Sequence, residues 1–386
     1  MLIRKKFLQQ IANQFEVHSL CALLGPRQCG KTTLSKDYAR DFQGKVHIFD
    51  LENPTHLARL ENPLLALSTL NGLVIIDEIQ RRPELFPILR VLVDEMDTKF
   101  LILGSASRDL IQQSSETLAG RIGYVELTPF HLEEVEDETL LWVRGGFPKS
   151  YLAEKENASF LWRENYIRTF LERDIPSLGF SIAPQHLRRF WMMLAHYHGN
   201  LFNASEIGRS LSISDHTAKK YLDILSGTFM VRSLPPWFEN TTKRQIKTPK
   251  IYFRDTGIFH TLMGLHTLEA IQNHPKLGAS WEGFALEQVI QKLDLYEGET
   301  FFWRTHAGAE LDLFILKEGK KFGFEFKYTD APKVSSSMRS AFESLDLNHL
   351  FLICPGHSCF LLRENITAIG LKKFIEEPFI NLQKEL

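Results

Sequence analysis

The feature that most restricts the fold of this chain is a glycine-rich loop near its N-terminus, Gly25-Pro-Arg-Gln-Cys-Gly-Lys-Thr32. The loop follows the apolar run Ser19–Leu24 and precedes a helical stretch, which is the setting that the G-x-x-x-x-G-K-[ST] pattern requires. Backbone N–H groups of such a loop wrap phosphates, and the N-terminus of the next helix favours their negative charge. A nucleotide-binding loop is therefore predicted rather than a chance turn, with the contacting residues Gly25, Pro26, Arg27, Gln28, Cys29, Gly30, Lys31, Thr32 and Thr33.

Two carboxylates, Asp77 and Glu78, stand at the end of the apolar strand predicted over Leu73–Ile76. Ligands bind outside the carboxyl ends of strands in open α/β sheets. We expect Lys31 to meet the β and γ phosphate oxygens and Thr32 to hold Mg²⁺, which Asp77 reaches through water. Glu78 is then expected to polarise the attacking water. The two motifs together predict a site that binds and hydrolyses ATP.

Two more polar residues are candidates for a role in hydrolysis. Ser105 follows the next apolar strand and is expected to sense the γ-phosphate between the two strands described above, with Ser107 as the alternate. The other reading is a serine that simply ends a strand. Arg121 is a candidate to neutralise transition-state charge across a subunit boundary, although a structural salt bridge explains it equally well. Arg27 and Arg108 are weaker competitors for that role.

Short apolar runs alternate with helical stretches through the first third of the chain. Such alternation indicates βαβ units and a mostly parallel sheet. The runs are Ser19–Leu24, Val46–Leu51, Leu73–Ile76, Phe100–Leu103 and Val125–Leu127.

Seven stretches follow one another in a specific order: Gly25–Thr33, Ile76–Arg81, Leu103–Ser107, Leu118–Ile122, Gly145–Pro148, Phe170–Asp174 and Trp303–Thr305. In this order the chain resembles a bacterial and archaeal family of AAA-type ATPases fused to a C-terminal domain of unassigned function. The resemblance covers roughly residues 20–330. It implies ATP binding, a Mg²⁺ requirement and a winged-helix-like middle. One departure is Ala106, where a second hydroxyl is usual, so the sensor is not tied to one serine.

The middle of the chain contains a predicted helix-turn-helix. Helices are expected over Ala204–Leu211 and His216–Ser226, with capping residues in the turn Ser212–Asp215. A winged helix would place the basic loop 240–247 beside phosphate, through Lys243, Arg244 and Lys247. In the same arrangement, the side chains of His216, Lys219 and Lys220 would point toward the DNA groove. An interdomain lid or a protein-contact module is the other reading of this segment.

The last part of the chain carries a second set of acidic residues. Trp281-Glu282 opens an apolar helix and Glu310-Leu-Asp312 begins a strand, while Glu325 and Lys327 end the next strand and share one of its faces. Their type and order resemble the PD-(D/E)xK nuclease site, with Leu311 where a proline is usual. The resemblance implies that Asp312 and Glu325 hold a divalent metal, with Glu282 in support. Lys327 would position or activate the attacking water. Solvated surface charges, or a nuclease-like fold that has lost catalysis, are the alternatives.

The composition is globular, with 44% hydrophobic and 24% charged residues and a formal net charge of −2. Overall charge therefore does not recruit nucleic acid, and any basic surface must be local. The sequence has no apolar run of about 18 residues and no signal-peptide core at its beginning. Its four cysteines are expected to be reduced thiols. We expect a cytoplasmic protein that does not span a membrane.

With 386 residues, the chain is longer than one ordinary domain. We expect an α/β protein in three parts: an AAA-type P-loop ATPase domain with a parallel sheet over 1–130, a helical and winged-helix domain over 131–265, and a restriction-endonuclease-like α/β domain over 266–386. The expected cofactors are ATP and Mg²⁺, with a second Mg²⁺ or Mn²⁺ at the nuclease-like site. The expected function is ATP hydrolysis coupled to DNA binding or processing in a homo-oligomer. The alternative is an ATP-dependent switch or remodelling ATPase that acts on a protein partner and has an inactive nuclease-like fold.

Overall fold

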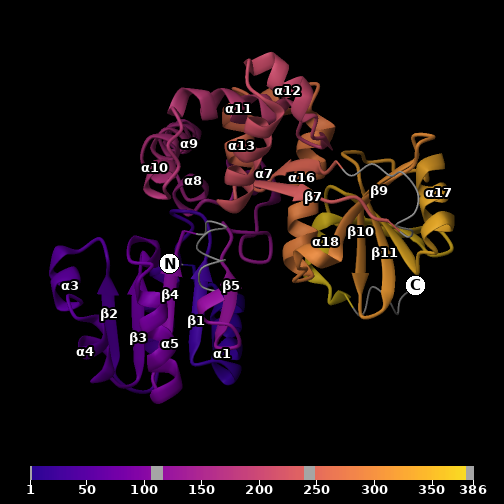
Figure 1. Cartoon of the computed structure of the whole chain (residues 1–386). Helices are drawn as coiled ribbons and strands as arrows, with labels where there is room; N and C mark the ends of the chain where they lie inside the picture. The colour runs from indigo at the N-terminus through magenta and orange to yellow at the C-terminus, as the bar shows by residue number, and fades with distance from the viewer. Residues whose placement is uncertain (1, 106–115, 239–247, 380–386) are drawn as a thin grey trace. The chain divides into compact units, whose positions relative to one another are not determined.

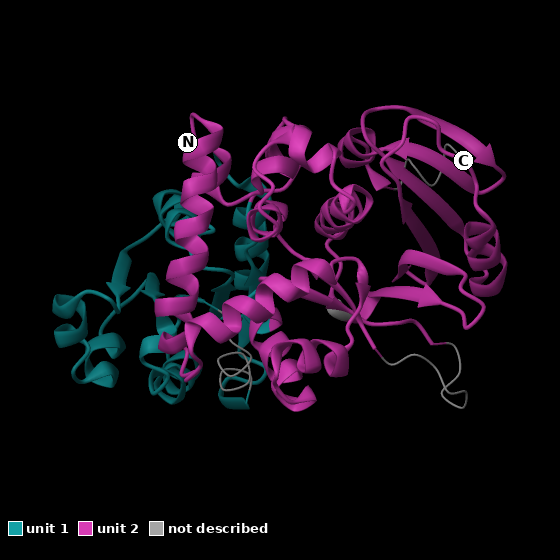
Figure 2. Cartoon of the chain, turned by 90° about the horizontal axis from the view of Figure 1, so that it is seen from above, with its two compact units in different colours: residues 1–129, 227–229 teal, residues 130–226, 230–386 magenta. Residues whose placement is uncertain are grey.

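The computed structural model describes residues 2–105, 116–238 and 248–379. The chain divides into two compact units, which Figure 2 shows in different colours. The first comprises residues 1–129 and 227–229, and the second comprises residues 130–226 and 230–386. The three-part division expected at residues 130 and 265 stays a prediction. None of the described helices has the length and apolar character that crossing a membrane requires.

The first unit is built on a five-stranded parallel sheet with the strand order β2-β3-β4-β1-β5 (Figure 1). This arrangement confirms the parallel sheet that the alternating pattern predicts. β4 lies between β1 and β3, so the carboxyl ends of these three strands are neighbours at one edge of the sheet. The strands are β1 (Leu20–Leu24), β2 (Val46–Asp50), β3 (Leu73–Asp77), β4 (Lys99–Gly104) and β5 (Ile122–Glu126).

Both faces of this sheet are covered by helices. Because successive residues of a strand point to opposite faces, Val74 and Ile76 join one hydrophobic core and Leu73 and Ile75 join the other. Helix α5 contributes buried leucines to the first core, and α1 packs on β1 and β5 in the second. The helical segments of this unit are α1 (Lys5–Val17), α2 (Lys31–Asp41), α3 (Pro54–Arg59), α4 (Pro63–Ser68), the 3₁₀ turn η1 (Ile79–Arg81) and α5 (Leu85–Glu95).

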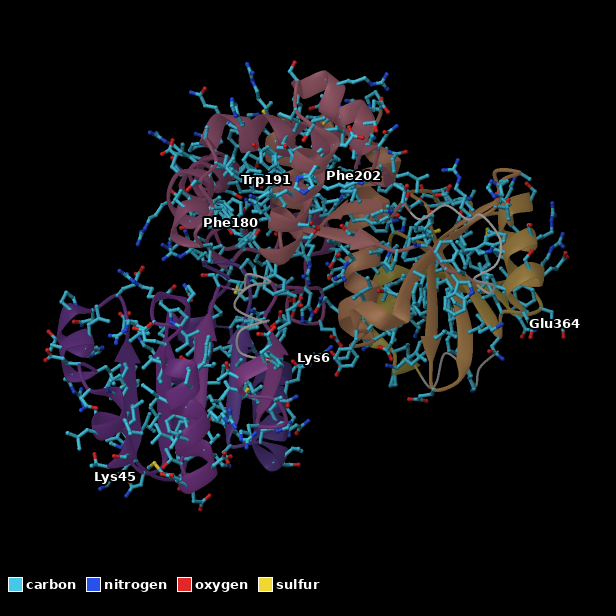
Figure 3. The ribbon with its side chains drawn as sticks, viewed as in Figure 1. Lys6, Lys45, Phe180, Trp191, Phe202 and Glu364 are labelled. Carbon is cyan, nitrogen blue, oxygen red and sulfur yellow. The ribbon has the colours of Figure 1, made fainter. Side chains whose placement is uncertain are left out.

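The second unit begins with helices that enclose an aromatic core. Trp191 and Phe202, labelled in Figure 3, are both buried in it. Its helical segments are α7 (Glu138–Arg144), α8 (Pro148–Tyr151), α9 (Glu156–Thr169), the π-helical segment η2 (Phe170–Asp174), α10 (Ile175–Ser177), α11 (Pro184–His196), α12 (Ala204–Leu211), α13 (Asp215–Gly227), α14 (Thr256–Leu262) and α15 (Leu268–Gln272). A small antiparallel sheet has the order β6-β8-β7, with β6 (Asn200–Leu201), β7 (Val231–Leu234) and β8 (Lys250–Phe253). Helices α12 and α13 lie where the helix-turn-helix pattern predicts them, and the winged-helix assignment stays a prediction.

The paired glycines Gly145 and Gly146 form a turn against Asp255. A side chain at Gly145 would place its Cβ 2.2 Å from Asp255 Oδ1, so no larger residue fits. The carboxylate accepts hydrogen bonds from the backbone N–H of Gly146 (2.8 Å) and of Ile258 (2.9 Å). Asp255 therefore caps α14 and fixes this turn at the same time.

The C-terminal part of the second unit is a mixed six-stranded sheet with the order β13-β14-β12-β11-β10-β9. β9, β10 and β11 pair antiparallel, whereas β11 pairs parallel with β12. α16 contacts β11 and α18, and α17 packs on β10 and β11 on the other side of the sheet (Figure 1). The elements are α16 (Leu277–Lys292), η3 (Glu297–Glu299), β9 (Thr300–Arg304), β10 (Glu310–Lys317), β11 (Lys320–Phe326), α17 (Ser336–Leu345), β12 (His349–Cys354), β13 (Cys359–Arg363), β14 (Ile366–Gly370) and α18 (Leu371–Glu376).

Candidate functional site

The glycine-rich loop joins the end of β1 to the first residue of α2, as the phosphate-binding pattern requires. Gly30 adopts a φ of 105°, a left-handed conformation that glycine tolerates best. Gly25 has a different constraint, because a Cβ there would lie 2.1 Å from the carbonyl oxygen of Leu127. Cys29 is fully buried inside the loop and fills space there. These constraints hold the loop backbone at the N-terminus of α2, where N–H groups can meet phosphate oxygens.

Lys31 is a buried cation in this loop. Its Nζ donates hydrogen bonds to the carbonyl oxygens of Gly25 (2.9 Å) and Pro26 (2.8 Å). A buried ammonium is costly unless it is paired, and these two carbonyls supply its partners. The ammonium is thus held over the loop, where it can bind an anion.

Thr32 and Asp77 meet directly at the ends of neighbouring motifs. The hydroxyl of Thr32 donates to Asp77 Oδ2 at 2.6 Å, and Asp77 Oδ1 accepts the backbone N–H of Glu78 at 2.9 Å. A hydroxyl and a carboxylate are oxygen ligands of the kind that Mg²⁺ prefers. The donor set therefore fits the ion that a bound nucleotide would bring.

Glu78 directly follows β3 in a left-handed conformation, with a φ of 59°. Burial raises the pKa of its carboxyl, while the charges of Arg27 and Lys31 lower it in part. The guanidinium of Arg27 lies 3.9 Å from Glu78 and forms a closer ion pair, at 3.0 Å, with Glu52. Glu78 is thus a partly desolvated carboxylate, and such a group is suited to accept a proton from water.

Gln80 is a residue of this site that sequence reasoning missed. Its side-chain nitrogen donates hydrogen bonds both to Glu78 Oε2 and to Ser105 Oγ, the latter at 3.0 Å. Ser105 follows β4, between the ends of β1 and β3. The sequence signals for Gln80 are its place two residues after Glu78 and its position within the stretch Ile76–Arg81 that carries the family resemblance. Two alternates lie outside the described residues: Ser107, for sensing the γ-phosphate, and Arg108, for neutralising transition-state charge.

Arg121 forms a two-pronged ion pair with Asp94 of α5. Nε lies 2.6 Å from one carboxylate oxygen, and Nη2 lies 2.9 Å from the other. A third bond runs from Arg121 Nη1 to the carbonyl oxygen of Ala119 at 3.1 Å. The salt-bridge alternative for Arg121 is thus present in this structure, and its role in catalysis stays a prediction.

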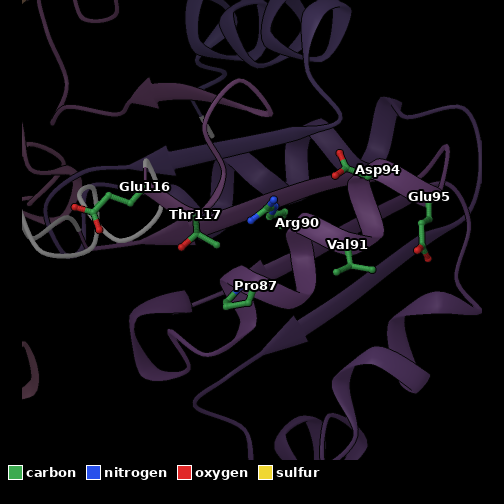
Figure 4. A pocket seen from close by; sticks show the side chains of 7 residues that line it. All are labelled: Pro87, Arg90, Val91, Asp94, Glu95, Glu116 and Thr117. Atoms are coloured by element: carbon green, nitrogen blue, oxygen red, sulfur yellow. The ribbon is translucent and has the colours of Figure 1, made fainter.

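Asp94, the ion-pair partner of Arg121, also lines a surface cavity of about 580 Å³ in the first unit (Figure 4). Most of its lining comes from α5, and the rest comes from the segment that precedes Arg121. The lining residues are Pro87, Arg90, Val91, Asp94, Glu95, Glu116 and Thr117.

In the second unit, the structure brings together the acidic residues that the nuclease resemblance singles out. Asp312 and Glu325 stand on neighbouring strands, and Glu282 lies within α16 rather than at its beginning. All three side chains are largely buried, and the charge of Asp312 acts on both glutamates. Lys327 lies 3.3 Å from Glu325, and Asp312 Oδ2 accepts the backbone N–H of Phe326 at 3.1 Å.

Two further residues of this acidic centre, Lys250 and Tyr252, were missed from the sequence. Lys250, at the start of β8, points its Nζ at Glu310 and also lies 3.5 Å from oxygens of both Glu282 and Asp312. The hydroxyl of Tyr252 donates to Glu282 at 2.5 Å. No local pattern could reveal these two partners, because they come from the small antiparallel sheet. Glu310, in contrast, lies two residues before Asp312 in β10 and therefore on the same face of the strand.

Burial dominates the electrostatics of this centre. Burial, and then the charge of Asp312, raise the pKa of Glu282 to about 7 and that of Glu325 to about 8. Burial disfavours the charge on Lys250, but Tyr252 and the three nearby carboxylates outweigh it and raise the pKa of Lys250 well above its usual range. The acidic groups around Lys250 thus favour the charged form of its ammonium.

The donor set in this centre does not fit a divalent metal as it stands. Among residues 2–105, 116–238 and 248–379, no three acidic, histidine or cysteine side chains are arranged to hold a metal ion. The ammonium of Lys250 already lies among the carboxylates of Glu282, Glu310 and Asp312. The metal-binding and catalytic roles expected for Glu282, Asp312, Glu325 and Lys327 stay predictions.

The helix-turn-helix residues are exposed on α13. His216, Lys219 and Lys220 all face solvent, as a role in groove contact requires. Lys243, Arg244 and Lys247 of the expected basic loop lie outside the described residues.

Three families match successive parts of the chain. Residues 17–136 match the AAA domain, and residues 135–269 and 277–374 match two domains of unknown function, DUF8612 and DUF4143. The AAA match covers the loop, the two carboxylates and the five-stranded sheet. This family implies the use of ATP and Mg²⁺.

Curated relatives and solved structures extend the comparison. The chain is 49% identical over 351 residues to uncharacterized proteins Rv2008c of Mycobacterium tuberculosis and Mb2031c of Mycobacterium bovis, covering 90% of this chain and 79% of each relative. Among solved structures, the Walker-type ATPase PABY2304 of Pyrococcus abyssi has a TM-score of 0.47 at 15% identity, covering 68% of this chain and 96% of that one. A RuvB mutant of Thermotoga maritima has a TM-score of 0.32 at 18% identity, covering 61% and 90%. The chain therefore belongs to the family of the two mycobacterial proteins, and its N-terminal part is an AAA-type P-loop ATPase domain.

Proposed function

We propose that this protein hydrolyses ATP with Mg²⁺ and uses its nucleotide state to change how its remaining domains engage DNA. The observation that carries the first half is the hydrogen bond from Thr32 to Asp77, flanked by the buried ammonium of Lys31 and the carboxylate of Glu78. An ammonium for phosphate, two oxygen ligands for Mg²⁺ and a base for water are the parts that phosphoryl transfer to water needs.

Each residue has a separate task in this proposal. Lys31 replaces its hydrogen bonds to two loop carbonyls with contacts to phosphate oxygens. Thr32 would hold Mg²⁺ and Asp77 would reach it through water; when bound, this ion would supply positive charge beside the phosphates. Glu78 orients the attacking water and accepts its proton, while Ser105 contacts the transferred group. Arg121 acts from a neighbouring subunit of a homo-oligomer.

Steady-state ATP hydrolysis and nucleotide binding test this assignment. Lys31→Ala is expected to remove nucleotide binding, because it deletes the charge that meets the phosphates. Glu78→Gln is expected to keep binding and stop turnover, because an amide cannot accept the proton. Normal hydrolysis by Glu78→Gln would show that another group is the base.

DNA is the proposed target of the switch because α12 and α13 present exposed basic side chains in a helix-turn-helix order. The alternative target is a protein partner. Stimulation of ATP hydrolysis by DNA supports the first, whereas stimulation by a protein partner but not by DNA supports the second.

DNA cleavage by the C-terminal domain is the second candidate function, and the observation that favours it is the largely buried set of Glu282, Asp312 and Glu325. Cleavage with Mg²⁺ or Mn²⁺ that disappears in Asp312→Ala would establish it. If no DNA is cleaved at high protein and Mn²⁺ concentrations, the C-terminal domain would be a nuclease-like fold that lacks nuclease activity and is coupled to the ATPase.

A further inference from the structure

Lys250 is an unusual residue because it is almost fully buried and charged. Its side chain is 3% exposed, and lysine is rarely buried to this degree unless it is paired. Its ammonium meets carboxylates from two different elements, Glu282 of α16 and both Glu310 and Asp312 of β10. The ammonium thus occupies the kind of position among carboxylates that a bound metal ion occupies in an acidic site.

The groups around the Lys250 ammonium favour one positive charge at this position. The Nζ lies 5.8 Å from the centre of the Phe302 ring, whose face also attracts cations. Tyr252 satisfies Glu282 by donating its hydroxyl hydrogen, and the backbone N–H of Phe326 satisfies Asp312. Each of these two carboxylates therefore already has a donor in addition to Lys250.

We propose that the ammonium of Lys250 is the built-in cation of this acidic centre and stands where a divalent metal would bind. The protein as it folds therefore takes up no divalent metal between Glu282 and Asp312. Removal of the ammonium opens the centre to Mn²⁺ or Mg²⁺, because the same carboxylates are then left without their cation. This inference concerns the C-terminal centre alone, and it holds whether or not the N-terminal domain hydrolyses ATP. It is incompatible with the second candidate function above, so metal-dependent DNA cleavage that requires Asp312 would contradict it.

The proposal explains why acidic residues can be buried here without a metal. Carboxylates in low-dielectric surroundings repel one another and need a cation or protonation. A divalent ion brought beside Lys250 would face repulsion from an ammonium that contacts the same oxygens. The lysine and the metal are thus alternatives for one position.

Mn²⁺ binding to the full chain without nucleotide tests the proposal by isothermal titration. Asp312→Asn reports the Mn²⁺ binding at all other sites. The difference in Mn²⁺ binding between a protein with Asp312 and the same protein with Asp312→Asn therefore reports this centre. Wild type and Asp312→Asn are expected to bind Mn²⁺ alike. Lys250→Met is expected to gain one Mn²⁺ site at least tenfold tighter than any in wild type, and Lys250→Met with Asp312→Asn is expected to lose it. Lys250→Arg keeps a cation in place and should gain no site.

Thermal unfolding gives a second measurement that does not depend on activity. Mn²⁺ should raise the Tm of Lys250→Met and leave the Tm of wild type unchanged. If Lys250→Met does not fold, Lys250→Met combined with Glu310→Gln replaces it, because that pair removes one positive and one negative charge together.

Two results would overturn the proposal. One is Mn²⁺ binding to wild type that Asp312→Asn abolishes, since Lys250 would then not exclude the metal. The other is a folded Lys250→Met, alone or combined with Glu310→Gln, that binds no additional Mn²⁺. ATP hydrolysis by Lys250→Met should equal that of wild type, so a failure of the ATPase proposal is detected separately.

Discussion

Gln80 and Ser105 are joined by a hydrogen bond of 3.0 Å between the ends of β3 and β4. The same nitrogen of Gln80 donates to the carboxylate of Glu78, so one amide holds both the proposed base and the proposed sensor. The other amide atom, Oε1, is buried and has no hydrogen-bond partner among the described residues. A buried acceptor of this kind is available to a ligand or a water that enters the site.

Gln80→Leu is therefore expected to lower kcat for ATP hydrolysis by about tenfold or more, because small displacements of catalytic groups are costly in rate. The KM for ATP should change little, since Gln80 does not belong to the phosphate loop. Steady-state kinetics measures both values. Gln43→Leu, at an exposed position on the segment after α2, is the control and should behave as wild type. A kcat within about twofold of wild type in Gln80→Leu would remove Gln80 from the mechanism.

The nucleotide site could largely be anticipated because its information is local. Gly25 to Thr33 lie in one loop and the first turn of α2, and Asp77 ends one apolar strand. Periodicity and motif together therefore predict where each stands. The place of Ser105 also followed from the strand pattern, because β4 inserts between β1 and β3. The structure added the contacts that spacing does not encode, among them the bond of Thr32 to Asp77.

The partners of Arg121 and Asp312 could not be predicted, because they are distant in sequence. Asp94 precedes Arg121 by 27 residues, and Lys250 precedes Asp312 by 62 residues. The sequence around Lys250 is an apolar strand with one lysine at its start, a pattern more typical of an exposed strand end. Only the packing of β8 beside α16 and β10 turns this lysine into the centre of an acidic cluster.

Arg121→Ala is expected to lower ATP hydrolysis without weakening ATP affinity, because an arginine finger contributes about 10³- to 10⁵-fold to turnover. Asp94→Asn breaks the same ion pair but keeps the guanidinium, so it is expected to retain hydrolysis. Equal losses in both variants would make Arg121 a structural residue.

Mixing two inactive variants tests whether Arg121 acts between subunits. Arg121→Ala keeps its own Lys31 and Glu78, whereas Glu78→Gln keeps its Arg121. In a mixed oligomer, the arginine of the second variant can serve the site of the first. Hydrolysis should therefore reappear on mixing, and a mixture as inactive as its components would argue against action in trans.

The buried His260 predicts a dependence of stability on pH. Its ring contacts the carbonyl oxygen of Val143 (3.2 Å) and the hydroxyl of Ser280 (2.7 Å), and burial lowers its pKa to about 3. The pKa of His260 is lower in the folded than in the unfolded protein. Its contribution to the free energy of unfolding is therefore fully present above about pH 6.5 and is lost as pH falls toward 3.

His260→Gln removes this titration and can keep polar contacts at the site. Between pH 6 and 4.5, the slope of the unfolding free energy against pH should decrease by about 1.4 kcal/mol per pH unit, the value for one proton. Chemical denaturation at several pH values measures it. His216→Gln, at an exposed position of α13, is the control and should follow wild type. An unchanged slope in His260→Gln would mean that His260 does not govern acid sensitivity.

The exposed lysines of α13 make the DNA proposal testable through salt dependence. Each phosphate contact contributes about 0.9 to the slope of log K against log salt concentration. Lys219→Ala with Lys220→Ala should therefore weaken DNA binding and reduce that slope by about 1.8, if each lysine meets one phosphate. Fluorescence anisotropy with a labelled duplex at several salt concentrations measures both effects. Lys149→Ala with Lys155→Ala removes two other exposed lysines of the same unit and should leave the slope unchanged. Equal slopes for wild type and both double variants would turn the search toward a protein partner, because α13 would then make no contact with phosphate.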